Sequence, residues 1–511
     1  MNSLKKLSKL LPAASLPALL AEGFSDERIL RWICQRSFLC FCMAVKPDYM
    51  ATNFHTYLAY RFQKIYEQVK NGVDQRTALS CPPQHGKSTL ASVLFPAWVL
   101  GKEAWPVIVA SYGASLAERK SQEARDILSE PMFQLIFPGV KLHPDSTSKE
   151  FWRTTKGGSY RAVGVGGGLT GMSGKLMICD DPFAGMAEAS SEVIRESTAS
   201  WWKTVFYTRK QSKSALILIN TRWHLDDVEG RLLEEEADAL AAGLPEGQFD
   251  KWEHLKFPAI AEEDEYLDGK LFRRAGEVLS PERFTLEDMI KTRNSMKVEE
   301  WASLYQQNPI LQENAKFKTD WFKYFTEKDI TGKYLDVYVT VDPAISQKKR
   351  ADNTSIQVGG KERNNPNIYH LEDITGKFDP LEIIQKLFEL KLKYKDRLKL
   401  VGIESVAYQK SLLYFLTEQM RLREIYFNVV ELKSKGSKEE RIEGLIGPYK
   451  AGVIFHRDTD KEMETEFLQF PKGKHDDRID AWSMMLDLIK NVPKNSGGAK
   501  RYVPKSTTYR H

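Results

Sequence analysis

The sequence predicts an α/β protein of two domains in series, each built on its own sheet. Between residues 76 and 222, short apolar runs that end in turn residues alternate with longer helical segments. From Leu335 onward, three strand-like runs follow one another before the next helix. Between these two patterns, residues 235–332 are rich in Glu, Asp, Gly and Pro and carry little strand signal.

The first pattern predicts a doubly wound sheet. Its apolar runs are nearly continuous, which is typical of parallel strands buried on both faces, with helices crossing between them. That alternation favours an open parallel sheet covered on both sides. A helix at Phe54–Val69, with apolar residues at spacings of three and four, precedes the first strand. The predicted strands are Thr77–Cys81, Val107–Ser111, Leu176–Cys179 and Ala215–Ile219.

The second pattern has the element order of an RNase H-like domain: three strands, a helix, a strand, and then further α/β elements. The first helix begins with Pro, at a position where the missing backbone N–H costs nothing. The predicted strands are Leu335–Val341, Ser355–Gly359, Asn367–Ile374, Leu398–Ile403 and Ile425–Val430. The predicted helices include Pro380–Tyr394 and a final one near Asp477–Lys490.

These patterns also predict the domain boundaries. A lid or linker part of the first domain starts at about residue 235 and contains a helix near Leu286–Gln306. We expect a first domain at 1–310, a linker at 311–332, a second domain at 333–490 and a basic, mobile tail at 491–511.

Composition excludes several classes of protein. Hydrophobic residues make up 42% and charged residues 28% of the 511 residues, so a disordered or fibrous chain is excluded. The five cysteines form no CxxC pair, which argues against a zinc site and favours a reducing compartment. The apolar run Leu10–Ala21 is interrupted by Pro12 and Pro17, so we expect an amphipathic helix there rather than a secretion signal. No run is long enough to predict a membrane span, and a net charge of +5 neither requires nor excludes nucleic acid.

A phosphate-binding loop is predicted directly after the first strand, in Cys81–Thr89. Backbone N–H groups of such a loop point at phosphate oxygens, and the dipole of the following helix also favours negative charge. Lys87 is expected to reach the β- and γ-phosphates of ATP, and the Ser88 hydroxyl to ligate Mg²⁺. Cys81 stands at the position of the usual first Gly. The predicted nucleotide-binding residues of the loop are Gln84, His85, Gly86, Lys87, Ser88 and Thr89.

Two further strand ends complete the predicted ATP site. Asp180 and Asp181 follow an apolar strand; the first can hold Mg²⁺ and the second can orient or deprotonate the attacking water. Alternatively, the pair caps a helix. After the strand Ala215–Ile219, Thr221 or Arg222 can sense the γ-phosphate, or Arg222 pairs with a neighbouring carboxylate.

Acidic residues at strand and helix ends predict a second site. Asp342 and Glu404 end strands that are neighbours in an RNase H-like sheet. Such a cluster repels itself unless cations neutralise it, and two Mg²⁺ or Mn²⁺ ions can then activate water against a phosphodiester. Asp477 and Asp480 lie three residues apart on one helix and are the other predicted ligands, while Asp476 can be the cap. Which of these three acids ligates metal stays open.

Basic residues thread the same domain, and a solvated surface is their default role. Only the group Lys433–Arg441 is predicted to contact a DNA backbone. Lys348, Lys349 and Arg350 remain surface residues in this interpretation, and Asp352 either belongs to the metal site or shapes a turn.

Taken together, these residues resemble the large terminase subunit of tailed bacteriophages. The resemblance covers nearly the whole chain, and the order and spacing of its motifs are specific. The motifs are Pro82–Ser88, Ser111–Lys120, Gly164–Gly174, Asp180–Pro182, Thr221–His224, Tyr305–Pro309 and Lys474–Asp480.

The resemblance implies an N-terminal packaging ATPase and a C-terminal nuclease of RNase H-like fold. It implies double-stranded DNA as cargo, a portal protein and a small terminase subunit as partners, a homo-oligomeric ring on the portal, no membrane partner, and action in the host cytoplasm. Many relatives carry an Arg in the phosphate loop where this chain has Gln84, so Arg119, Arg125 or Arg222 are the candidates for an arginine finger. The alternatives are a helicase-nuclease of DNA repair and a catalytically degenerate DNA-binding adaptor.

Overall fold

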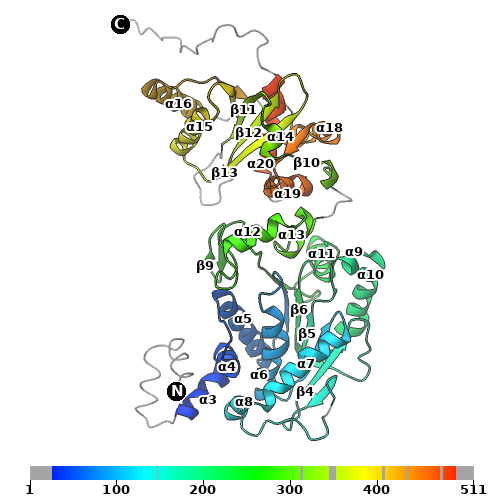
Figure 1. Ribbon diagram of the computed structural model, residues 1–511. Helices are drawn as coiled ribbons and strands as arrows, with labels where there is room; N and C mark the ends of the chain where they lie inside the picture. The colour runs from blue at the N-terminus through cyan, green and yellow to red at the C-terminus, as the bar shows by residue number, and fades with distance from the viewer. Residues whose placement is uncertain are drawn as a thin grey trace. The chain divides into compact units, whose positions relative to one another are not determined.

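The computed structural model describes residues 26–146, 148–310, 315–343, 353–404, 409–432, 436–471 and 476–490. The chain divides into two compact units between Leu311 and Gln312, and both are drawn in Figure 1. The apolar run at residues 10–21 and the basic tail from residue 491 lie outside the described residues. Among the described helices, none has the length and apolar character needed to cross a membrane.

The first unit is built on a seven-stranded sheet. Only the short strand β3 runs antiparallel to its neighbour. The strands are β1 (Gln75–Ser80), β2 (Pro106–Ser111), β3 (Phe151–Arg153), β4 (Ser159–Gly164), β5 (Gly174–Asp180), β6 (Lys210–Asn220) and β7 (Glu253–Lys256), in the order β3-β4-β2-β5-β6-β1-β7. The four strands predicted from apolar runs are β1, β2, β5 and β6. Because β6 lies between β1 and β5, the carboxyl ends of these three strands meet at one edge.

Helices cover both faces of this sheet, which confirms the doubly wound arrangement. Along β5, Leu176 and Ile178 face one core, whereas Met177 and Cys179 face the other. The first core holds α3 (Asp26–Arg36), α4 (Phe38–Val45), α5 (Asn53–Lys70), α6 (Phe95–Lys102), α7 (Ala114–Ser129) and α8 (Pro131–Ile136). The second holds α9 (Met186–Ser190), α10 (Glu192–Trp201) and α11 (Val228–Ala241). All five cysteines are buried and none is in a disulfide.

The end of the first unit is more structured than the sequence indicates. A hairpin of β8 (Glu265–Leu267) and β9 (Lys270–Arg273) precedes two helices, α12 (Leu286–Asn294) and α13 (Val298–Leu304). The sequence predicted one helix over this stretch. Thr285 begins α12 with a capping box. The predicted helix is divided because α12 ends at its C-cap Ser295 and a new first turn begins after Lys297.

The second unit has a mixed seven-stranded sheet. Its strands are β10 (Lys323–Tyr324), β11 (Leu335–Asp342), β12 (Thr354–Glu362), β13 (Ile368–Gly376), β14 (Leu398–Glu404), β15 (Val429–Leu432) and β16 (Ile454–His456), in the order β10-β16-β13-β12-β11-β14-β15. Strand β12 is antiparallel to both β11 and β13, while β14 and β15 run parallel to β11. The five predicted strands correspond to β11–β15. In chain order they lie in the sheet as third, second, first, fourth and fifth, which confirms the RNase H-like fold.

Helices also cover both faces of the second sheet. On one face, α15 (Pro380–Tyr394) and α16 (Gln409–Arg423) close the core around Val339 and Val401. On the other, α20 (Asp477–Lys490) packs closely on β12, because a Cβ at Gly359 would lie 2.9 Å from the Met485 sulfur. The remaining helices are α14 (Glu327–Ile330), α17 (Lys438–Glu443), α18 (Ile446–Lys450) and α19 (Lys461–Gln469).

Two expectations differ from the structure here. Residues 311–332 were expected to be a linker, but Phe317 is buried with its ring 4.6 Å from that of Phe467, and β10 pairs with β16. Aromatic burial thus draws this segment into the second unit. The strand predicted at Ile425–Val430 forms later, at β15, where pairing with β14 sets its register.

Candidate nucleotide site and carboxylate cluster

The loop between β1 and α6 has the backbone that phosphate binding requires. Gln84 and Gly86 adopt left-handed φ angles of 61° and 76°, and the chain becomes helical at Lys87. A Cβ at Gly86 would lie 2.8 Å from Nε2 of His55, so only glycine fits there. Cys81, at the position of the usual first glycine, is buried and offers its carbonyl oxygen to Lys87.

Lys87 lies where the three strand ends meet. Its Nζ donates to the carbonyl oxygens of Cys81, at 3.2 Å, and Asn220, at 3.3 Å, and also contacts the Thr221 hydroxyl. It lies 3.4 Å from an Asp181 oxygen. Burial lowers the pKa of Lys87, but Asp181, Cys81 and Asp180 together outweigh it, so the net pKa is raised and the ammonium stays charged.

Asp180 is fully buried and held by three donors. Ser88 Oγ donates to Oδ1 at 2.9 Å, Ser92 Oγ donates to Oδ2 at 2.5 Å, and Lys120 Nζ lies 2.7 Å from Oδ2. Burial raises the pKa of Asp180, but the charge and hydrogen bond of Lys120, the Ser92 hydrogen bond and the Lys87 charge together offset it, so the pKa is lowered. A hydroxyl and an ionised carboxylate side by side are the hard oxygen ligands that suit Mg²⁺, so these residues fit that ion. Lys120 was noted in the sequence only as part of a motif.

Asp181 is placed differently from its neighbour. It has a left-handed φ of 54°, and its buried Oδ1 accepts no hydrogen bond within the described residues. Burial raises its pKa despite the adjacent Lys87. The residue preceding α9 is Gly185, so the helix-cap alternative does not describe this pair. Asp181 Oδ1 lies 3.4 Å from Lys87 Nζ but accepts no hydrogen bond from the described residues, so it is able to hold a water molecule.

The alternatives for Thr221 and Arg222 are separated by geometry. Thr221 turns toward Lys87, as described above. Arg222 follows the alternative in which it pairs with a carboxylate: its buried Nε donates to Asp227 Oδ2 at 2.8 Å, and its predicted role at the nucleotide stays a prediction. Its backbone N–H also donates to the Gln307 side chain at 3.1 Å. The physical reason is the turn after β6, which brings Asp227, the N-cap of α11, back onto the guanidinium.

A further group of residues at this site could not be read from the sequence. The segment Ser280–Phe284 lies against the loop: the Phe284 ring is 5.0 Å from that of His85, and the Ser280 hydroxyl is 3.4 Å from that of Thr52. Next to it is a cavity of about 500 Å³. Its lining residues are Pro83, Gln84, Phe284, Asp288, Met289, Lys291, Thr292 and Tyr305.

The buried histidine of the loop, His85, predicts that stability depends on pH. Burial lowers the pKa of His85 to about 4, and the unfolded chain takes up that proton at about 6.5. Stability therefore falls as the pH drops from 6.5 toward 4, by up to about 1.4 kcal/mol per pH unit for this group. We expect His85→Gln to lose less stability than the wild type between pH 7 and pH 5 in urea denaturation. Parallel losses would contradict the assignment.

In the second unit, three carboxylates from separate elements converge. Asp342 ends β11 and Glu404 ends β14, and the parallel register brings the two ends side by side. Asp480 comes from the first turn of α20 and is buried. Burial, and then the charges of Glu404 and Asp480, raise the pKa of Asp342 to about 8. Carboxylates that cannot all ionise together offer the hard oxygens that divalent cations prefer, but their spacing in the described residues is not that of a bound ion.

Two cations of α17 lie among these acids. Arg441 Nη2 is 2.7 Å from Asp480 and 3.5 Å from Glu404, and Lys438 Nζ is 2.7 Å from Asp476 and 3.4 Å from Asp480. Within the described part of the chain, no three His, Cys, Asp or Glu side chains are close enough to hold a metal ion. Lys433 and Lys435, predicted with them as DNA contacts, lie outside the described residues, as do residues 348–350 and Asp352.

The structure also separates the acids of α20. Asp476 precedes the helix, and its carbonyl accepts from the Asp480 N–H at 2.9 Å, as a cap does. Asp477 was predicted as a ligand together with Asp480, but its charge acts on Glu466 of α19. Asp480 is thus the acid of this helix that faces Asp342 and Glu404.

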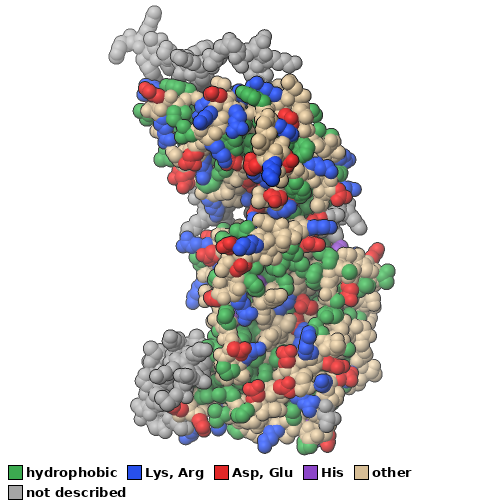
Figure 2. All heavy atoms as spheres, viewed as in Figure 1, with side chains coloured by type: hydrophobic (Ala, Val, Ile, Leu, Met, Phe, Trp, Pro, Cys, Tyr) green, Lys and Arg blue, Asp and Glu red, His purple; other side chains and the backbone are tan. Residues whose placement is uncertain are grey.

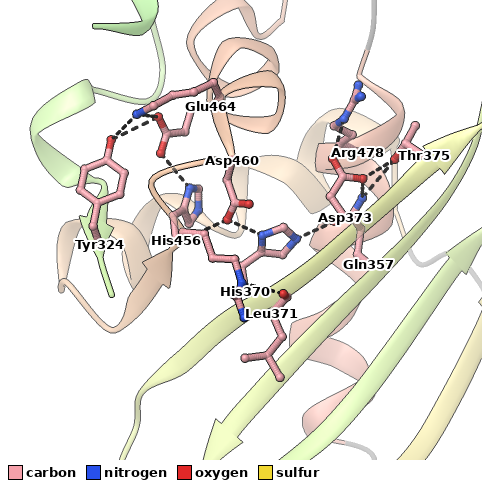
Figure 3. Close-up of polar contacts among 12 residues, drawn as sticks. Tyr324, Gln357, His370, Leu371, Asp373, Thr375, His456, Asp460, Glu464 and Arg478 are labelled. Carbon is pink, nitrogen blue, oxygen red and sulfur yellow. Dashed lines mark hydrogen bonds and ion pairs between the residues drawn. The ribbon is translucent and has the colours of Figure 1, made fainter. Parts of the chain in front are cut away.

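A buried polar network fixes the start of α20 (Figure 3). Arg478 Nε donates to Asp373 of β13 at 2.7 Å, and its Nη1 donates to Glu466 at 2.8 Å. From Asp373 the network continues through Gln357 to His370, whose other ring nitrogen is 2.6 Å from Asp460. These contacts anchor the helix that carries Asp480 to three other elements of the unit.

Comparisons with known proteins give consistent findings. Residues 79–324 match the family described as "Terminase large subunit, T4likevirus-type, N-terminal". The large terminase of bacteriophage HK97 is 12% identical, with 91% of this chain and 99% of that one covered at a TM-score of 0.34. The large terminase of a thermophilic bacteriophage is also 12% identical, over 84% and 98%, at 0.31. The P22 large terminase nuclease domain is 14% identical, over 35% and 91%, at 0.25. Among curated proteins, no relative matches the sequence.

Proposed function

Since residues 79–324 belong to the large terminase family, we propose that this chain is a genome-packaging motor. In this proposal it hydrolyses ATP to translocate double-stranded DNA into a procapsid, and it cuts the DNA concatemer by two-metal hydrolysis. The observation that carries the proposal is Lys87, which lies charged and buried at the meeting point of β1, β5 and β6.

For ATP hydrolysis, the backbone of Gln84–Thr89 binds the phosphates and Lys87 turns from its carbonyl acceptors to the β- and γ-phosphates. Ser88 and Asp180 hold Mg²⁺, which neutralises charge on the phosphates. Asp181 orients the attacking water through Oδ1, the oxygen that accepts no hydrogen bond in the described residues. Thr221 changes partner when Lys87 moves, and the adjoining Arg222–Asp227 pair passes that change to the start of α11.

For DNA cleavage, Asp342, Glu404 and Asp480 would hold two Mg²⁺ or Mn²⁺ ions, and Asp477 is the further acid proposed for this site. When bound, such ions would supply the positive charge that activates a water molecule and stabilises the leaving oxygen of a phosphodiester. The raised pKa of Asp342 supports this assignment, because the ions stabilise the ionised form that the cluster itself disfavours. Lys438 and Arg441 turn from the acids to the DNA backbone when the ions bind.

The partners proposed are double-stranded DNA, a portal protein, a small terminase subunit and further copies of this chain in a ring, in the host cytoplasm. On the face shown in Figure 2, Lys and Arg side chains are interspersed with Asp and Glu. Backbone contacts of individual basic residues, rather than one basic stripe on that face, are therefore expected to hold the DNA.

The function is tested on the purified full-length chain. We expect phosphate release from ATP in Mg²⁺ that rises when double-stranded DNA is added, and cutting of plasmid DNA in Mg²⁺ or Mn²⁺ that EDTA stops. A forked duplex should stay paired. Unwinding of the fork would indicate a helicase-nuclease, and zero ATP turnover across several metals would indicate an adaptor.

A further inference from the structure

Arg283 lies beside the phosphate loop, a position that the sequence analysis did not predict for it. One of its terminal nitrogens would be 3.7 Å from a Cβ at Gly86, so the guanidinium reaches the glycine that precedes Lys87. Its own segment is held against the loop by the Phe284–His85 ring contact. Its charge also contributes to keeping both His55 and His85 neutral.

The guanidinium has no counter-charge among the described residues. Within the described residues, Arg283 makes no ion pair with a carboxylate, and its buried Nε has no hydrogen-bond acceptor. Two other buried polar atoms near it, Tyr49 Oη and His55 Nε2, also lack partners. A partly buried arginine without a counter-charge is costly unless an anion completes its environment.

The loop supplies the expected anion. Gly86 and Lys87 are the residues whose N–H groups and ammonium face the phosphates in the proposed function. We propose that Arg283 binds the polyphosphate of the nucleotide from the side of α12, as a second cation besides Lys87. This inference rests on the proposed ATP site and adds a residue to it. Of the arginines named from the sequence, Arg222 pairs with Asp227 and Arg119 is exposed on α7.

The proposed contact between Arg283 and the phosphates links the phosphate loop to the cavity beside α12. Arg283 and Phe284 are adjacent in sequence, and Phe284 lines the cavity together with Gln84 of the loop. An Arg283–phosphate contact therefore draws the start of α12 onto the bound nucleotide. An arginine guanidinium can donate two parallel hydrogen bonds to phosphate oxygens. Lysine at this position should therefore keep the positive charge but not the paired hydrogen bonds.

The test is calorimetric binding of ATP and of inorganic tripolyphosphate, which has no base or sugar. We expect Arg283→Met to weaken both ligands by a similar factor, about ten- to hundredfold. Arg283→Lys should weaken both by less. Arg274→Met, at an exposed arginine of the β9 end, is the matched control and should bind as the wild type does.

Each other outcome overturns the inference. If Arg283→Met weakened ATP but not tripolyphosphate, the arginine would contact the base or ribose instead. If both ligands bound as to the wild type, it would have no role in binding. Melting without ligand checks that the Met variant folds, and the Lys variant keeps the test decisive if it does not. Failure of the proposed function looks different, because the wild type itself would then bind neither ligand.

Discussion

Lys87→Ala is expected to reduce ATP hydrolysis by about 10²–10³-fold or more, while metal-dependent cutting of DNA continues at the wild-type rate. The buried ammonium touches the ends of all three central strands, through Cys81, Asp181 and Asn220. Its removal takes away charge stabilisation of the phosphates and leaves Asp181 without its counter-ion. Phosphate release and plasmid cleavage, measured on the same preparation, check both halves of this prediction.

The control for this substitution is Lys251→Ala. Lys251 belongs to the same unit, but it is exposed and pairs only with the exposed Glu246. We expect its replacement to change neither activity, since exposed ion pairs contribute little. If Lys87→Ala destroyed cutting as well, with the fold intact by circular dichroism, the assignment of the two activities to separate units would be wrong.

The sequence predicts the centre of each sheet well, and the reason is physical. Strands β1, β2, β5 and β6 are buried on both faces, so their apolar runs are unbroken and easy to recognise. Strand β4 alternates Tyr160, Arg161 and Ala162, and β7 contains charged residues, so neither gives that signal. Short edge strands such as β10 are defined by their partner rather than by their own residues.

The same distinction applies to the sites. Lys87, Ser88 and Asp180 follow strands, and the topology of a parallel sheet brings such positions together wherever the chain goes next. Lys120 and Arg283 reach the ATP site from a helix face and from the lid segment, and only the packed fold determines where those lie. Likewise, spacing alone places Asp477 and Asp480 on one helix, but the rotation of α20 against β11 decides that Asp480 faces Asp342.

Asp342→Asn is expected to reduce the rate of DNA cutting by about 10²-fold or more, with the rate of ATP hydrolysis unchanged. The amide keeps the size and the hydrogen-bonding shape of the side chain, but it cannot supply the negative charge that holds divalent ions. Asp336→Asn is the matched control, because Asp336 lies on the same strand and pairs with the surface residue Arg363. Supercoiled plasmid with Mn²⁺ gives the rate of cutting. Cutting at the wild-type rate by Asp342→Asn would remove this residue from the metal site.

A second measurement on the same variant separates charge from shape. In the folded chain without metal, the pKa of Asp342 is raised to about 8, against about 3.8 when unfolded. The folded state therefore holds a proton that the unfolded state has lost, so stability falls as the pH rises from 3.8 to 8. In EDTA, we expect Asp342→Asn to lack this component and to gain stability relative to the wild type with rising pH. Adding Mn²⁺ should make the wild type more stable than Asp342→Asn, because the ions stabilise only the wild-type carboxylate. If the variant remained the more stable protein in Mn²⁺, the ions would have no site at Asp342.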